Sequence, residues 1–151
     1  LMLAPAALRQ GLTAGYRVLG VKKPYDGSAN AFIVSTPYLE VGGVGLTTEK
    51  ACKLGYNPVA VSITCYDRDA PRKRGLLKAK LLIDRKTTRI LGFQVIGWRG
   101  ILNYLNVISF AIKHGAKLED LFFFEHAYSP IVSRLYTPIH VLLRRALEVV
   151  S

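Results

Sequence analysis

The sequence has little of several features that mark specialised classes of protein. Only two of its 151 residues are cysteines. This excludes a disulfide framework and favours a reducing compartment, the cytoplasm. No uncharged apolar run approaches the roughly 18 residues of a membrane-spanning helix, so we expect no membrane partner. Hydrophobic residues make up 50% of the chain and charged residues 21%, which excludes disorder and predicts a single folded domain.

Self-sufficient catalytic and metal-binding motifs are also missing. The sequence contains no GxGxxG, no P-loop, no HExxH and no CxxC. His114, His126 and His140 lie far apart without metal-ligand spacing, so no metal site is expected. His114 should end a helix, and His140 should face solvent in the first turn of the last helix. We expect Cys52 and Cys65 to be structural residues rather than reactive thiols.

Acidic residues are scarce, and the chain carries a formal net charge of +11. Residues 68–89 hold nine basic residues and two acids, and Arg72, Lys73 and Arg74 lie between two apolar runs as a predicted hairpin tip. A charged strand edge that discourages edge-to-edge pairing is the favoured interpretation. A phosphate-bearing small ligand comes second. Nucleic acid comes third and is not expected as a partner, because only Tyr66 lies nearby to stack on bases.

The N-terminal part of the sequence predicts one helix and a boundary. Residues 4–19 have a helical pattern, with Pro5 tolerated in the first turn and Gly20 as the stop. A turn-rich linker over residues 22–28 is the best candidate for a domain boundary. The first residues, beginning at Leu1, lack the basic start of a signal peptide, and we expect the chain to be a piece of a longer protein.

The remaining sequence predicts an α+β order rather than a doubly wound parallel sheet. Pro37 restricts its strand to an edge or a bulge. Thr47 should cap a short helix, and Thr137 should cap the last helix ahead of Pro138 in its first turn. Strands are predicted over residues 31–38, 59–66, 76–84 and 89–97, and helices over residues 4–19, 47–55, 101–113 and 137–150.

One irregular segment between the predicted helices carries candidate functional groups. Glu125, His126, Tyr128 and Pro130 combine two ionisable groups, a phenol and a proline in a loop, where functional side chains are often displayed. The alternative is a loop in which Tyr128 packs its ring and hydrogen-bonds its hydroxyl. On composition alone, this alternative leads.

Several segments, taken in order, resemble one family along nearly the whole chain. The chain resembles the C-terminal end of flavin-dependent pyridine nucleotide–disulfide oxidoreductases. The resemblance implies an α+β domain with an antiparallel sheet of about four strands and helices on one side. It divides the chain into the tail helix of an FAD-binding domain (residues 1–23) and a dimerisation, or interface, domain (residues 24–151). The segments that carry it are residues 44–51, 54–56, 81–84, 89–97 and 111–121.

The first helix matches the last helix of the family's FAD domain. In that family its N-terminus, here Leu3, Ala4 and Pro5, points at the flavin. Free backbone N–H groups and the positive end of the helix dipole suit the negative charge of a reduced flavin. The resemblance thus implies FAD in the full-length protein, with NAD(P)H as electron donor. The fragment alone should bind no FAD tightly, because the dinucleotide-binding fold is missing. An ordinary alanine-rich helix is the alternative.

The loop after the aromatic cluster is similar to that of the coenzyme A disulfide reductase and NADH oxidase branch. Classical disulfide reductases carry a catalytic histidine where this chain has Tyr128. The branch has a tyrosine there, in an Ala-Tyr-x-Pro-Pro segment followed by an aromatic-Asp-Pro segment. The chain departs from that pattern twice, with Ile131 in place of the second proline and Thr137 in place of the aspartate.

The resemblance also suggests the rest of a candidate site. Tyr66 best matches a second tyrosine that the branch offers, and His126 is a third catalytic candidate. Two phenols could donate hydrogen bonds to a thiolate or to an oxyanion near the flavin. Arg72, Lys73 and Arg74 would then suit the phosphates of coenzyme A.

Two functions of different classes follow. The first is a C-terminal fragment of an FAD-dependent NAD(P)H oxidoreductase that supplies homodimerisation and part of the partner subunit's active site. The sequence does not decide whether the electron acceptor of this oxidoreductase is coenzyme A disulfide, another disulfide, a persulfide or oxygen. The alternative is a stand-alone, non-catalytic dimerisation or interaction module. In either case, the helices after Gly97 and the aromatic residues 122–124 should form a two-fold interface.

Overall fold

Five antiparallel strands form one sheet in the order β1-β2-β5-β4-β3 in the computed structural model, which describes residues 3–70 and 74–150. This confirms the α+β prediction. The strands are β1 (Phe32–Ser35), β2 (Glu40–Gly45), β3 (Pro58–Tyr66), β4 (Leu76–Asp84) and β5 (Ile90–Gly97). The helices are α1 (Ala4–Val18), α2 (Thr48–Lys53), α3 (Ile101–Lys113), α4 (Leu118–Phe122) and α5 (Pro138–Val150).

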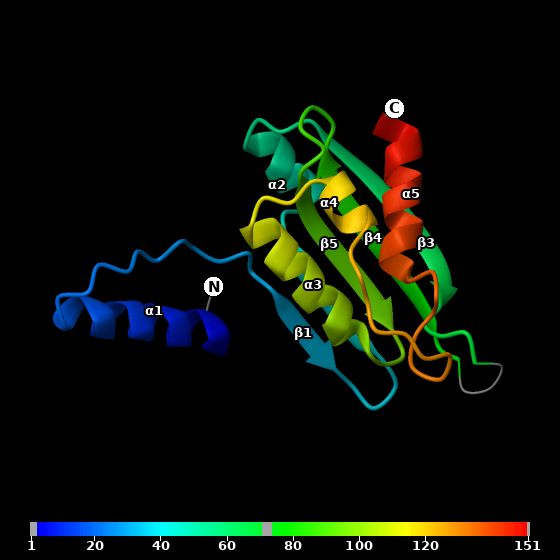
Figure 1. Cartoon of the computed structure of the whole chain (residues 1–151), viewed down its shortest axis with the longest axis horizontal. Helices are drawn as coiled ribbons and strands as arrows, with labels where there is room; N and C mark the ends of the chain where they lie inside the picture. Colours follow the sequence, from blue (N-terminus) through cyan, green and yellow to red (C-terminus); the bar gives the residue numbers. More distant parts are fainter. Residues whose placement is uncertain (1–2, 71–73, 151) are drawn as a thin grey trace.

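Three helices cover one face of the sheet and enclose the main core. Figure 1 shows α3, α4 and α5 in front of the strands. Alternate residues of β3, β4 and β5 point toward these helices, as the period of two in a half-buried strand requires. The largest fully buried side chains of this layer are Phe93, Leu77, Leu81, Ile83, Ile101, Ile108, Leu118, Ile139, Leu142 and Leu143.

Helix α2 is an exception to the predicted one-sided arrangement. Its buried residue, Ala51, packs with Leu82 and Leu91, which point to the sheet face opposite the main core. Thr47 caps this helix as predicted, because its hydroxyl accepts a hydrogen bond from the Lys50 N–H at 3.3 Å. One short helix therefore covers part of the second face.

The sheet has five strands rather than about four, because the predicted strand over residues 31–38 is part of a hairpin. The chain turns at Thr36, which bonds to Leu39 on the far side of the turn, so Pro37 lies in the turn and not in a strand. The strand that was not predicted, β2, contains three glycines and has low strand propensity. Gly42 allows a close approach of α3, since a Cβ there would overlap the side chain of Leu105.

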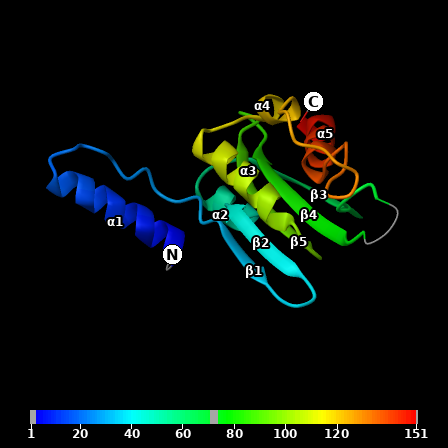
Figure 2. The same ribbon diagram turned by 60° about the horizontal axis from the view of Figure 1, so that its bottom comes forward.

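Helix α1 has the predicted position and end but stands apart from the layered domain (Figures 1 and 2). Gly20 follows it with a φ of 74°, a left-handed conformation that favours glycine at a helix end. Only Ala6 of this helix is buried, whereas Leu8 and Leu12 remain 65% and 54% exposed. Over residues 3–70 and 74–150, none of the helices has the length and apolar character needed to cross a membrane.

Candidate functional site

Tyr128 lies on the irregular segment between α4 and α5, at the start of a tight turn. The N–H groups of Val132 and Ser133 both donate to the Ser129 carbonyl, at 3.0 and 2.9 Å. The Tyr128 side chain is 43% exposed, and its hydroxyl makes no hydrogen bond to any residue that the structure describes. The arrangement presents a free phenol rather than the packed and hydrogen-bonded loop tyrosine of the alternative interpretation. A phenol so placed can donate a hydrogen bond to an incoming group.

His126 turns inward from the same segment. Its Nε2 atom is buried and has no hydrogen-bond partner among the described residues. The ring lies 5.1 Å from the ring of His140 and 5.8 Å from that of Phe124, measured between centroids. The structure thus places His126 and Tyr128 close in sequence but in different surroundings, since His126 is half-buried with its Nε2 covered and Tyr128 is exposed.

His140 is buried, and the prediction that it faces solvent is wrong. The Phe124 ring stacks on it at 5.0 Å with the ring planes 6° apart, and Nδ1 lies 2.7 Å from the Thr137 hydroxyl. Thr137 also caps α5 as predicted, accepting from the His140 N–H at 3.4 Å. Burial lowers the pKa of His140, and the nearby His126 lowers it further. The first turn of α5 is therefore covered by Phe124 of the preceding segment, a contact that the pattern of α5 alone does not reveal.

Tyr66 ends β3 on the sheet face opposite the main core. Its neighbour Cys65 points to the core side, so the alternation along the strand turns Tyr66 the other way. The Arg74 guanidinium lies 4.2 Å from the centroid of the Tyr66 ring, a cation–π contact. No contact joins Tyr66 to Tyr128 among the described residues, so the structure does not bring the two candidate tyrosines together. Arg72 and Lys73 lie outside the described residues.

Tyr104 is a residue near the site that the sequence analysis missed. It is half-buried on α3, and burial, together with Cys65 and Asp67, raises the pKa of its phenol to about 12. Burial likewise raises the pKa of the Cys65 thiol. The helical spacing from Ile101 through Tyr104 to Ile108 is the signal that would have placed this tyrosine on the inner face.

A cavity of about 390 Å³ lies between α3 and the irregular segment of residues 123–137, which we call the Tyr128 segment. Its lining mixes cations, two acids, hydroxyls and apolar groups, and includes Arg68, Arg99, Tyr104 and His126. Within residues 3–70 and 74–150, no cluster of three histidine, cysteine or acidic side chains could hold a metal ion. Cys52 lies exposed on α2, and neither it nor Cys65 forms a disulfide.

The N-terminus of α1 is an open positive helix end. Leu3 precedes the helix without a side-chain cap, and the first turn contains no acidic residue. A cavity of about 710 Å³ lies between this end and α3, lined by Leu3, Pro5 and Ala6 on one side and by Leu102 and Leu105 among others on the other. The positive end of the helix dipole stabilises a nearby negative charge, although Pro5 has no N–H and the N–H groups of Ala6 and Ala7 donate to the Leu3 carbonyl.

Comparison with known proteins supports one family. Residues 31–137 match the family model of the pyridine nucleotide–disulphide oxidoreductase dimerisation domain. Among curated relatives, the NAD(P)H sulfur oxidoreductase (CoA-dependent) of Pyrococcus furiosus is 31% identical over 143 residues, which cover 94% of this chain and 32% of the relative. The NADH oxidase of Methanocaldococcus jannaschii is 26% identical over 156 residues, covering 97% and 33%. The chain thus spans about a third of the length of these relatives.

Solved structures share the fold. The water-forming NADH oxidase of Lactobacillus brevis superposes with a TM-score of 0.92 at 22% identity, over 99% of this chain and 34% of that chain. The reduced CoADR-RHD of Bacillus anthracis gives 0.91 at 24% identity, over 98% and 27%. Because the family model matches more than half of the sequence, the chain belongs to the dimerisation-domain family of the pyridine nucleotide–disulphide oxidoreductases.

Proposed function

We propose that this chain is the C-terminal part of an FAD-dependent NAD(P)H oxidoreductase, where it pairs two subunits and presents Tyr128 to the partner's active site. The accessible phenol of Tyr128, which has no hydrogen-bond partner among the described residues, is the observation that carries this proposal. Relatives named as an NAD(P)H sulfur oxidoreductase and an NADH oxidase, matched over nearly the whole chain, support it. The two free cysteines fit a cytoplasmic protein.

FAD would supply the hydride and electron chemistry of such an enzyme. The described residues fit one part of its environment, because the uncapped start of α1 at Leu3, Ala4 and Pro5 can stabilise negative charge on the flavin. The sequence offers no glycine-rich phosphate loop, so this chain would contribute one helix end and little else to FAD binding. The purified fragment should therefore be colourless, and a stoichiometric yellow protein would contradict this division of the protein.

Tyr128 would act as a hydrogen-bond donor toward a thiolate or an oxyanion beside the partner's flavin. His126, which is half-buried and has its Nε2 covered, would have a smaller part. Tyr66 would serve a different surface, since it lies on the far face of the sheet under Arg74. If coenzyme A is a substrate, Arg74 together with Arg72 and Lys73 would suit its phosphates.

The central test is Tyr128→Phe in the full-length dimer. The change should slow disulfide or oxygen reduction by roughly ten- to a thousandfold, the range for loss of one oxyanion donor. Tyr38→Phe is a matched control, because Tyr38 is 82% exposed in the β1–β2 turn, and it should leave turnover unchanged. If Tyr128→Phe has no effect while His126→Ala abolishes turnover, the catalytic residue has been misassigned.

Homodimerisation is tested on the 151-residue chain itself. The segment around Tyr128 and the neighbouring helices expose several large apolar side chains, a load typical of an interface: Phe110, Phe123, Ile131, Val132 and Leu135. Sedimentation at micromolar concentration should show a dimer. A strictly monomeric species would contradict the proposal.

A stand-alone dimerisation module is the second candidate. It is favoured by the sheet domain, which fills its own core with almost no contribution from α1. The coding sequence upstream of Leu1 separates the two functions. A GxGxxG motif and a redox cysteine in frame would support the oxidoreductase, whereas an initiator codon directly before Leu1 would support the module.

A further inference from the structure

The connection that follows β3 runs beside the Tyr128 segment and is hydrogen-bonded to it. The Ala70 N–H donates to the Pro130 carbonyl at 2.8 Å, and the Asp69 N–H donates to the Ser133 carbonyl at 3.2 Å. In return, the Leu135 N–H donates to the Asp69 carboxylate at 2.8 Å. Residues 67–70, which we call the brace, are therefore hydrogen-bonded to the turn immediately after Tyr128.

Asp67 anchors the brace. Its carboxylate is almost fully buried and accepts three hydrogen bonds, from the Gly75 N–H at 2.9 Å and from Nε and Nη2 of Arg68 at 3.1 and 2.7 Å. A buried carboxylate is costly unless it is paired and hydrogen-bonded in this way. Asp67 thereby ties the two ends of the β3–β4 connection together and orients the Arg68 guanidinium.

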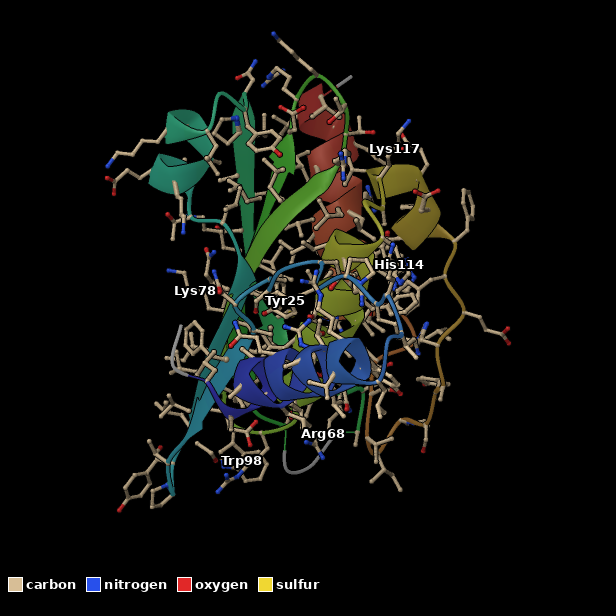
Figure 3. All side chains as sticks on the ribbon, turned by 90° about the vertical axis from the view of Figure 1, so that its left-hand side faces the viewer. Tyr25, Arg68, Lys78, Trp98, His114 and Lys117 are labelled. Atoms are coloured by element: carbon tan, nitrogen blue, oxygen red, sulfur yellow. The ribbon has the colours of Figure 1, made fainter. Side chains whose placement is uncertain are left out.

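Arg68 connects Asp67 to the Tyr128 segment through hydrogen bonds. Its remaining terminal nitrogen, Nη1, donates to the Ile131 carbonyl at 3.0 Å. Its guanidinium also lies 6.0 Å from the ring centroid of Trp98, and Figure 3 shows both side chains at the same end of the sheet. A planar fork that binds a carboxylate with two nitrogens and a carbonyl with the third cannot be replaced by a lysine ammonium.

We propose that Asp67 and Arg68 are positioning residues that hold the Tyr128-bearing turn in its working geometry, an inference that rests on the proposed role of Tyr128 at the partner's flavin. The Tyr128 side chain makes no hydrogen bond of its own within the described chain, so its direction depends on its backbone. The brace holds the carbonyls of Pro130, Ile131 and Ser133 in that backbone. Misplacement of a catalytic group by about 1 Å can cost roughly a hundredfold in rate.

The first experiment tests whether the brace holds the turn in place, and it does not depend on catalytic activity. Amide exchange is followed by NMR in the 151-residue chain for Arg68→Lys, with Arg85→Lys as the matched control, because Arg85 bonds a helix carbonyl, that of Val149, far from the brace. In Arg68→Lys, the amides of Ala70, Ser133 and Leu135 should exchange at least about tenfold faster, and the emission of the single tryptophan, Trp98, should change. Unchanged exchange at these amides would overturn the inference and leave the proposed function untouched.

The second experiment measures turnover in the full-length dimer. Arg68→Lys should lower kcat by roughly ten- to a hundredfold with an unchanged KM for the pyridine nucleotide. Added to Tyr128→Phe, it should cause little further loss, since both changes remove the same contribution. Full kcat in Arg68→Lys, with Tyr128→Phe slow, would overturn the positioning role. Normal turnover in Tyr128→Phe would instead overturn the proposed function. Asp67→Asn gives a second variant with the same expectations.

Discussion

Two helices of similar length show how differently this chain uses its apolar residues. Helix α5 has 13 residues and buries six of them within the layered domain, whereas α1 has 15 residues and buries only Ala6. Both have apolar residues at helical spacing, so their patterns look alike in the sequence. Most helical stability in proteins comes from packing of such a face. The comparison teaches that periodicity predicts a helix but not where its partner surface lies.

The two regions should respond very differently to the loss of one leucine side chain. Leu143→Ala opens a cavity in the main core, where the side chain is fully buried, and should lower the free energy of unfolding by about 2–5 kcal/mol. Leu12→Ala removes a side chain that is 54% exposed on α1 and should change it by no more than about 0.5 kcal/mol. Urea unfolding followed by circular dichroism measures both. Equal effects would show that α1 is part of the core.

Two glycines extend the comparison with a smaller effect. A Cβ at Gly92 in β5 would overlap the backbone oxygen of Leu46, so Gly92→Ala should destabilise the domain by about 1–3 kcal/mol. Gly11 in α1 has open space around its Cα, and Gly11→Ala should raise the helix content by favouring α1, by about 0.5–1 kcal/mol. Gly92→Ala should lower the urea midpoint, whereas Gly11→Ala should raise the helical circular-dichroism signal before the transition and leave the midpoint nearly unchanged. A neutral Gly92→Ala would mean that the Leu46 backbone can move aside at no cost.

A third contrast concerns pH. Hydrogen bonds from Thr87, then from the Asn57 backbone, lower the pKa of Asp84 below its ordinary value, against the opposing effect of burial. A lowered carboxyl pKa stabilises the fold above the unfolded pKa of about 3.9, and this stabilisation is lost as the pH falls through the folded pKa. The urea midpoint should therefore fall between about pH 5 and pH 2, and less steeply in Asp84→Asn.

Helix α1 provides the control for this pH dependence. It contains no carboxylate, so its own helical signal should stay level over the same pH range. An unchanged midpoint slope in Asp84→Asn would show that other carboxylates dominate the acid response.

Removal of residues 1–23 should have the smallest effect of all. Apart from Ala6, residues 3–23 contribute little buried surface, and Asp26, whose carboxylate pairs with Lys113 at 3.0 Å, is retained. The shortened chain should unfold with a midpoint within a few degrees of the parent, as measured by calorimetry. A collapse of stability would contradict the predicted boundary between residues 23 and 24.

Local sequence signals predicted the fold where local chemistry decides it. Thr47 and Thr137 cap their helices, Gly20 follows α1, and the loop of residues 84–88 joins β4 to β5, as expected from their side chains alone. The failures depend on distant partners. β2 forms because β1 and β5 pair with it despite its three glycines, and His140 is buried because Phe124 stacks on it.

The candidate site shows the same division. The irregular segment that carries Tyr128 was predicted from the sequence around it, whereas the exposure of Tyr128 was not, because composition alone favoured a packed ring. The distance of Tyr66 from that segment did not, because it depends on strand alternation and on which sheet face the helices cover. Tyr104 and the brace at Asp67 and Arg68 were missed, since their contacts join segments that no local pattern connects.

The brace also has a consequence for the order of folding. Its side-chain hydrogen bonds to the Tyr128 segment join residues 63 to 66 positions apart, whereas β3, β4 and β5 pair as consecutive strands. Closing a long loop costs chain entropy before its contacts repay it, so near-neighbour strands form early and distant contacts late. We expect the three consecutive strands β3, β4 and β5 to form the folding nucleus and the Tyr128 segment to become ordered last. The part of the chain proposed to meet a second subunit would then reach its final shape close to the moment of encounter.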